Sequence, residues 1–212
     1  GYWPEMMPYE PDAHLYQYDE IGGYWGVGFG NEIGFGLVKY EGVEGLTEIL
    51  SIGTFVLYAG SGVEISIYDT FDGQLSGLLF SMNEILCDLP GYYTFEMDSS
   101  LFIPQGQTFY ILVKYNSHHP AGQWPIPVED TIPGYSTPAL ESGVNWTAPD
   151  PYTWPAAWYQ TGLGTPFPYD LCIKAYSEKW PLPPVPQVFA GIDDTIVQGA
   201  GFSPDGTNVQ NA

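Results

Sequence analysis

The sequence predicts an all-β protein, an antiparallel β-sandwich of jelly-roll type. Aromatic residues make up 17% of the chain, and 26 glycines and 20 prolines give it a composition dense in turns. Several segments also alternate apolar with polar side chains, which is the period of two that is typical of strands. Because so much aromatic surface can offset the entropy lost on ordering, we expect most of the chain to fold.

The first predicted strands follow an extended N-terminal arm. Residues 1–20 are rich in Pro, Tyr and acidic residues and have no sustained period, so we expect an arm there. Segments 24–30 and 33–40 alternate apolar residues with glycines. Glycine within a strand marks a bulge or a close backbone approach, so we predict that both strands precede the core or lie at its edge.

Clearer strands are predicted over 49–58, 63–68 and 77–81. Residues 63–68 alternate strictly, which predicts a sheet with one solvated face. The dipeptide Asp72-Gly73 then supplies the residue of positive φ that a tight turn requires.

Another pair of strands is predicted over 92–97 and 107–115. Polar residues 98–100 and the Pro-Gln-Gly sequence 104–106 separate them. Nearly every residue from 109 to 115 is apolar, so we expect this strand to be central, with both of its faces covered.

The part of the chain after residue 115 sets the predicted domain boundaries. Residues 116–168 carry many prolines and four tryptophans, so we expect loops and edge strands, the places where binding sites form. Residues 169–176 are the last strong strand. We therefore predict a sandwich domain over 21–179, a Pro-rich linker over 180–187, and a β tail over 188–212 that is a partial second module or an edge-pairing strand.

Five segments carry a family resemblance through their order and spacing: 24–30 (YWGVGFG), 91–95 (GYYTF), 106–114 (GQTFYILVK), 124–129 (WPIPVE) and 171–176 (LCIKAY). Together they resemble the lectin-like β-sandwich accessory domain that follows papain-like cysteine protease domains in secreted bacterial and archaeal proteins. The resemblance covers residues 15–177 and implies a jelly-roll-like sandwich in an extracellular, secreted or cell-surface protein. The protease domain is absent, so the resemblance carries over no enzymatic role and no ligand residues. Residues 190–197 resemble the opening strand of PKD-like, immunoglobulin-like modules.

The charge balance restricts the partners. There are 25 acidic residues against four lysines and no arginine, for a net charge of -21. Nucleic acid and anionic membrane surfaces are held by Lys and Arg, so we predict neither as a partner. No apolar run reaches the roughly 18 residues of a membrane-spanning helix, so we predict no membrane insertion. The excess of carboxylates serves solubility or supplies oxygen ligands for calcium.

The two cysteines, Cys87 and Cys172, leave two alternatives open. One disulfide between them would close a long loop in an oxidising compartment, or both are buried free thiols. Cys87 with His14, His118 and His119 has the residue types of a thiol nucleophile and base, but the nucleophile motifs of protease families are missing. We therefore predict that the protein is not an enzyme.

Calcium is the only cofactor that the sequence leaves open, and none is required. The candidate ligands are Asp69 and Asp72 in a turn and Glu129 in the Pro-Ile-Pro-Val-Glu segment. No stretch matches the twelve-residue calcium loop, and turn carboxylates that bind their own backbone are the alternative.

Aromatic residues in the irregular region are the candidate carbohydrate site. Trp124, Trp154, Trp158 and Tyr159 could form a platform on which sugar rings stack, or they fill the core or a subunit interface. The sequence thus favours a surface-binding or adhesion module whose partner is a glycan or a cell-surface component. The alternative is a filament or surface-layer subunit that binds copies of itself by exchange of terminal strands, using residues 1–20 and 185–212.

Overall fold

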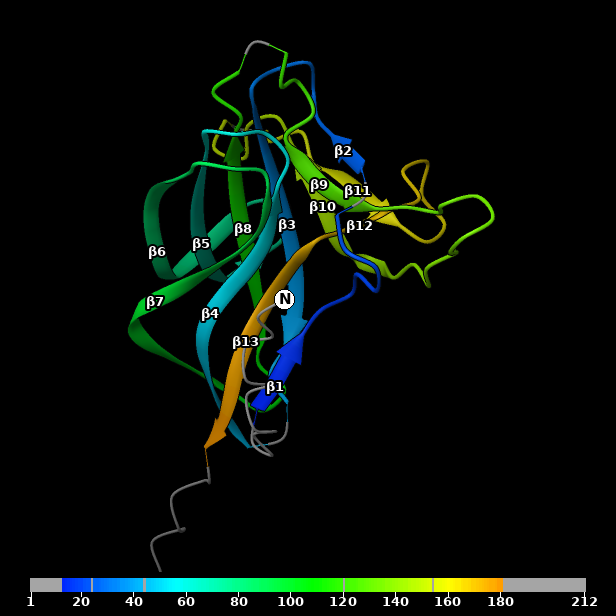
Figure 1. Cartoon of the computed structure of the whole chain (residues 1–212). Coiled ribbons are helices and arrows are strands. Elements are labelled where there is room, and N and C mark those ends of the chain that lie inside the picture. The colour runs from blue at the N-terminus through cyan, green and yellow to red at the C-terminus, as the bar shows by residue number, and fades with distance from the viewer. Residues whose placement is uncertain (1–12, 24, 44, 120, 154, 181–212) are drawn as a thin grey trace, which may run out of the picture. The chain divides into compact units, whose positions relative to one another are not determined.

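The all-β prediction is confirmed. The computed structural model describes residues 13–23, 25–43, 45–119, 121–153 and 155–180, which form thirteen strands and no helix (Figure 1). Across these same residues, no helix has the length and apolar character to cross a membrane.

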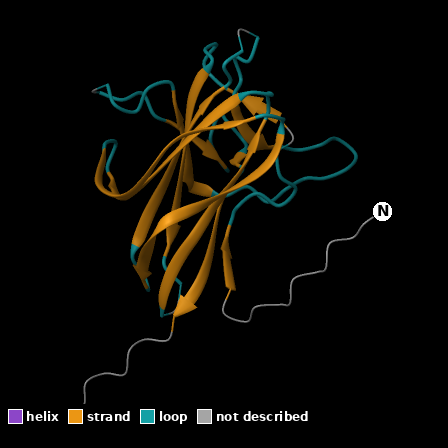
Figure 2. Cartoon of the chain, turned by 60° about the vertical axis from the view of Figure 1, so that its left-hand side comes forward, coloured by secondary structure: helices purple, strands orange, loops and turns teal. Residues whose placement is uncertain are grey.

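Two antiparallel sheets form the layers of a sandwich, and loops connect the strands at their ends (Figure 2). One sheet has the order β1-β13-β4-β7, from Ala13–Tyr16, Ile173–Trp180, Leu46–Val56 and Gly91–Pro104. The other has the order β11-β10-β3-β8-β5-β6, from Tyr159–Gly162, Ser142–Ala148, Ile33–Glu41, Thr108–Asn116, Ser61–Phe71 and Leu75–Cys87. A small sheet, β12-β9-β2, adds Asp170–Leu171, Ile126–Glu129 and Trp25–Val27.

Strand β8 shows how the core is divided between two apolar clusters. It lies between β3 and β5, and its Phe109, Ile111 and Val113 join the main cluster between the two large sheets. Successive side chains of a strand point to opposite faces, so Leu112 joins a second cluster on the other face, together with Leu37 of β3. The prediction of a central strand covered on both faces is therefore confirmed.

The prediction for 33–40 was wrong, because β3 is an interior strand between β10 and β8. Its glycines mark close packing. A Cβ on Gly34 would lie 2.9 Å from the Ile126 side chain, and one on Gly36 would lie 3.2 Å from that of Ile173. The glycines thus let other strands pack closely on an interior strand. The other glycine-containing segment does supply an edge strand, β2, at the side of the small sheet.

The strands β6 and β7 are longer than predicted. β7 continues through residues 98–100, which the sequence analysis assigned to a break, and its pairing with β4 shifts register between Ile49 and Ser51. A bulge accommodates the extra polar residues without ending the strand. The turn between β5 and β6 is confirmed at Asp72-Gly73, where Gly73 has a φ of +95°.

Residues 13–16 of the predicted arm form β1, which is hydrogen-bonded to β13. Residues 1–12 and 181–212 lie outside the described residues, so the linker, the β tail and its resemblance to PKD-like modules stay predictions.

Candidate functional site

Glu129, a predicted calcium ligand, has a structural role in the fold. Its carboxylate is buried on β9 and accepts hydrogen bonds from the backbone amides of Glu20, at 2.8 Å, and Ile21. Asp69 and Asp72 lie at the far edge of the six-stranded sheet, around the β5–β6 turn. The structure does not bring the three together, and across the described residues no group of three His, Cys, Asp or Glu side chains is arranged to hold a metal ion.

Two further buried carboxylates, Asp19 and Asp170, join loops to strands. Asp170 accepts hydrogen bonds from Asn145 Nδ2 at 2.9 Å and from the Glu141 amide at 3.1 Å. Lys174 Nζ lies 2.8 Å from Asp19 Oδ2, an ion pair by distance, although neither Asp19 oxygen makes a well-aligned hydrogen bond. Burial is the main cause that raises the pKa of both carboxyls, that of Asp170 to about 6. These fully buried groups anchor the loops.

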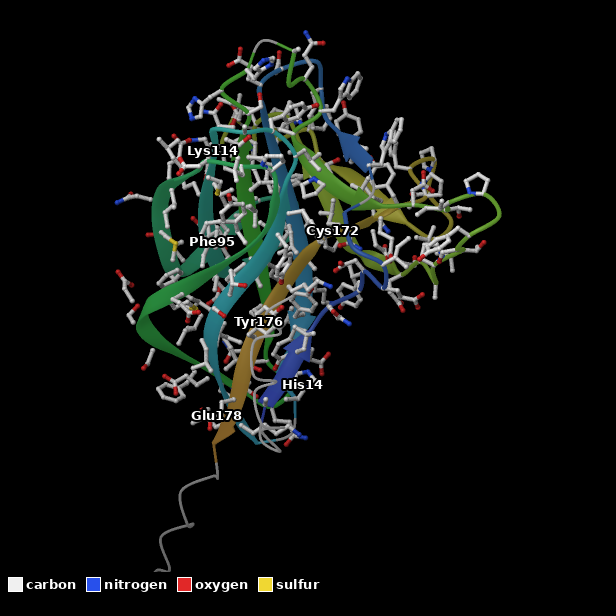
Figure 3. All side chains as sticks on the ribbon, in the orientation of Figure 1. His14, Phe95, Lys114, Cys172, Tyr176 and Glu178 are labelled. Carbon is white, nitrogen blue, oxygen red and sulfur yellow. The ribbon has the colours of Figure 1, made fainter. Side chains whose placement is uncertain are left out.

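Both cysteines are buried free thiols, so the structure does not contain the disulfide that the sequence left open. Cys87 ends β6, whereas Cys172 lies between β12 and β13 (Figure 3 labels Cys172). Burial raises the pKa of both thiols, for Cys172 well above its usual value. A neutral thiol is a poor nucleophile, so neither cysteine is activated for catalysis.

Of the four predicted aromatic residues, the three that the structure describes do not form one platform. Trp158 packs in the second apolar cluster, 5.0 Å from Phe71 between ring centroids, which is the core alternative. Trp124 is exposed on the loop before β9, and Trp154 lies outside the described residues. Tyr159, on β11, lines a small pocket.

We call this hollow the aromatic pocket. Its volume is about 250 Å³. Around Tyr159, the ring of Phe29 lies at 5.4 Å and that of Phe167 at 6.0 Å, and Tyr169 lies 6.3 Å beyond Phe167. Burial raises the pKa of Tyr169 to about 12, so its hydroxyl stays protonated. The lining residues are Val27, Gly28, Phe29, Thr147, Tyr159, Phe167 and Tyr169.

A larger hollow, which we call the polar cleft, lies at one end of the six-stranded sheet. Its volume is about 760 Å³, within the range of roughly 300–1,000 Å³ that is usual for ligand sites. Cross-strand neighbours Phe35 and Lys114 belong to its wall (Figure 3 labels Lys114). Ile33 and Asn116, at the ends of β3 and β8, and the adjoining loops supply the remaining lining. The residues concerned are Gly30, Asn31, Glu32, Ile33, Phe35, Lys114, Asn116, His118, Gln123, Pro149 and Asp150.

Carboxylates engage both basic side chains of the polar cleft. Lys114 Nζ lies 2.9 Å from Glu64 Oε2, and His118 Nε2 lies 3.1 Å from Glu84 Oε1. Asn116 holds this second pair in place. Its Oδ1 accepts a hydrogen bond from the backbone amide of His118, and its Nδ2 donates one to the Glu84 carboxylate. His118 has a φ of +49°, a conformation that non-glycine residues seldom adopt. The network fixes the loop at the cleft wall.

The two hollows draw lining residues from the same segments of the chain. The aromatic pocket is lined by Gly28 and Phe29, and the polar cleft by Gly30, the next residue. Strand β10 likewise supplies Thr147 to the pocket, and Asp150 just beyond it lines the cleft. Thr147 lies opposite Gly36 of β3, whereas the neighbouring residue of β3, Phe35, lines the cleft together with its partner Lys114. Because successive side chains of a strand point to opposite faces, the pocket and the cleft lie on opposite faces of the six-stranded sheet.

Comparison with known proteins identifies the family. The model of the lectin-like domain matches residues 15–177. The chain belongs to the lectin-like domain family. The lectin-like resemblance found in the sequence is thereby confirmed, while a search of curated proteins finds no match.

Solved structures share the fold of this lectin-like domain. One holds the cysteine protease and lectin-like domains of Cwp84, a surface-layer-associated protein of Clostridium difficile, with a TM-score of 0.60 at 14% identity. The match covers 81% of this chain and 37% of that one. A second, the clostridial cysteine protease Cwp84 after propeptide cleavage, gives 0.62 at 15% identity over 81% and 41%. The chain thus spans well under half the length of both matched structures.

Sequence reasoning found one ring of the lectin-like domain's aromatic pocket and missed three. Phe29 comes from the glycine-rich segment, and Phe167 and Tyr169 come from the Pro-rich loop before β12. The run Phe-Pro-Tyr shortly after Tyr159 was the available signal. Phe29 could not be grouped with it, because only the pairing of β3, β10 and β11 brings Phe29 close to a segment 130 or more residues later in the sequence.

Proposed function

We propose that this lectin-like domain is a non-catalytic module of a larger secreted or cell-surface protein, and that it binds carbohydrate in the aromatic pocket. The observation that carries the proposal is the set of rings around Tyr159, which line one small hollow. Flat rings offer an apolar face to the apolar face of a pyranose, and a few polar groups then fix its orientation.

The chemistry of the pocket supports binding without catalysis. The half-buried Tyr169, whose hydroxyl is protonated, can hydrogen-bond to a sugar hydroxyl. The lining of the pocket contains no carboxylate, histidine or thiol that could act as an acid, a base or a nucleophile. Surface attachment of Cwp84, a relative in fold, is consistent with an extracellular location.

The test is a pair of ring deletions. Tyr159→Ala and Phe167→Ala each remove a half-exposed ring, so we expect glycan affinity to fall by about tenfold with little loss of stability. Binding is measured on a glycan array and by pull-down with insoluble polysaccharides. The matched control is Tyr135→Ala, which removes a ring that is 81% exposed in a separate turn. Absence of binding to every glycan would refute the proposal.

A second candidate is self-assembly, and one observation favours it. The 13-residue strand β6 ends the six-stranded sheet, and Leu78 and Leu86 on it are 56% and 64% exposed. An open apolar edge can accept a strand from another copy, as terminal strand exchange requires. Light scattering tests this, because the variant Leu78→Lys/Leu86→Lys should convert assemblies to monomers. A monomeric wild-type chain at all concentrations would exclude it.

A further inference from the structure

Trp25, an exposed residue of β2, lies on the same face of that strand as part of the pocket wall. Val27 and Phe29 line the aromatic pocket, and Trp25 comes two positions before Val27 in the same strand. Since successive side chains of a strand point to opposite faces, Trp25 and Val27 share one face. A strand rises about 3.3 Å per residue, so their Cα atoms are about 7 Å apart. The Trp25 side chain is therefore the next one along β2 after the pocket wall.

Glycines leave the opposite face of β2 to the chain that precedes β9. A Cβ on Gly26 would lie 2.5 Å from the carbonyl oxygen of Trp124, and one on Gly28 would lie 3.0 Å from the Trp124 Cα. Only residues without a side chain allow the backbone of this segment to come so close. The side chains of β2 are therefore confined to the face that carries the pocket wall.

The aromatic pocket by itself is small for a ligand site. Its volume of about 250 Å³ lies below the roughly 300–1,000 Å³ that is usual, so it has room for one sugar ring but not for a longer chain. A second sugar must therefore lie outside the pocket. Trp25 is 58% exposed and offers a flat apolar ring beside the wall, where the apolar face of that second sugar can stack.

The charges of the pocket favour a neutral ligand. None of the described residues that line it carries a charged side chain. A charged sugar would lose its hydration there without gaining an ion pair, which costs free energy. The net charge of -21 also repels anionic chains, most strongly at low salt.

Resting on the proposed function, we propose that the ligand is a neutral oligosaccharide of at least two residues, with one ring in the aromatic pocket and the next stacked on Trp25. The shared face of Trp25 and Val27 and the small volume of the pocket carry this assignment. Trp25 is then the residue that makes affinity depend on the length of the glycan.

The first test is the dependence of affinity on length, measured on the whole chain. The probes are single sugars, disaccharides and tetrasaccharides of the glucose, N-acetylglucosamine and mannose series, with the same lengths of the neutral glycan that binds best on the array. Calorimetry gives the affinity of the longer probes, and NMR titration gives that of the weaker single sugars. Affinity should rise about tenfold from the single sugar to the longer probes, because only these reach Trp25.

The second test removes the ring. Trp25→Ala should lower tetrasaccharide affinity about tenfold and leave single-sugar affinity unchanged, whereas Tyr159→Ala, in the pocket itself, should weaken binding of every length. Trp25→Phe keeps a ring and should retain most of the gain with length. The matched control is Trp124→Ala, because Trp124 is 51% exposed and its backbone lies on the glycine face of β2. It should bind every probe as the wild type does.

Several outcomes overturn this inference and leave the proposed function intact. They are an affinity that does not rise with length, a Trp25→Ala variant that loses affinity equally for all lengths or not at all, a loss in Trp124→Ala in place of Trp25→Ala, and binding of charged glycans only. Failure of every probe, together with a blank glycan array, overturns both proposals.

Discussion

Carboxylates occur in two contrasting regions of this domain. Beside the small sheet, Asp19, Glu129 and Asp170 are fully buried, and backbone amides or a side-chain partner engage each of them. At the polar cleft, Glu32 and Asp150 are exposed. The same chemical group therefore holds loops in one region and remains accessible to a ligand in the other. Burial and partners, rather than residue type, separate the two roles.

The largest expected effect comes from breaking the buried ion pair. Lys174→Met leaves Asp19 without its cation, and because the Asp19 side chain is fully buried we expect a loss of about 3 kcal/mol in the free energy of unfolding. Urea denaturation measures this. Lys114→Met is the matched control at the cleft, where both partners are partly exposed and the loss should stay below about 1 kcal/mol. If both variants lost the same free energy of unfolding, the carboxylates of the two regions would not differ in their structural role.

A smaller effect is expected from pH. The pKa of Asp170 is raised from 3.8 to about 6 in the folded chain, so folding disfavours its ionised form. The penalty is fully present above pH 6 and disappears as pH falls towards the unfolded value. Acidification should therefore increase the free energy of unfolding, by about 1 kcal/mol after allowance for solvent screening. Thermal unfolding across this window measures the change.

Asp170→Asn separates this group from the other carboxylates. The variant cannot ionise, so its stability should depend less steeply on pH than that of the wild type between about pH 7 and pH 4. An unchanged slope would mean that other groups, such as Asp19 and Glu129, whose pKa values burial also raises, dominate the pH dependence.

The smallest expected change in stability is that of an exposed carboxylate in the polar cleft, which can be compared with the buried carboxylates beside the small sheet. Glu32→Gln removes an exposed carboxylate that has no ion-pair partner within the described residues, so the free energy of unfolding should change by less than about 0.5 kcal/mol. Differential scanning calorimetry measures it. A loss as large as that of Lys174→Met would place Glu32 among the structural carboxylates.

The strands that the sequence predicted well are those whose alternation survives in the fold. Of the strand predicted over 107–115, residues 108–115 lie in β8, because an uninterrupted apolar run requires cover on both faces. Residues 33–40 were placed at an edge, because glycine has the same appearance in a weak outer strand and in an interior strand that other side chains approach closely. The run 98–100 was taken as a break, since a bulge has no distinct pattern in a single sequence.

The candidate site was predictable only in part. Tyr159 was identified, but Trp158 next to it packs into the core, because rings serve burial and binding equally well and neighbouring residues face opposite sides. The structural role of Glu129 depends on amides more than 100 positions away in the sequence, which no local pattern records. Distant partners, in both cases, decided the role of the residue.

The pairing of β1 with β13 determines how this domain responds to a pulling force. Ala13 lies opposite Glu178 and Tyr16 opposite Ala175, so the chain enters and leaves at the same end of the sheet. Tension applied at residues 13 and 180 would therefore break the hydrogen-bonded pairs between β1 and β13 one after another, instead of loading all of them at once in shear. We expect β1 to detach at low force. Behind it, β13 remains fastened along eight paired positions to β4, where mechanical resistance should begin.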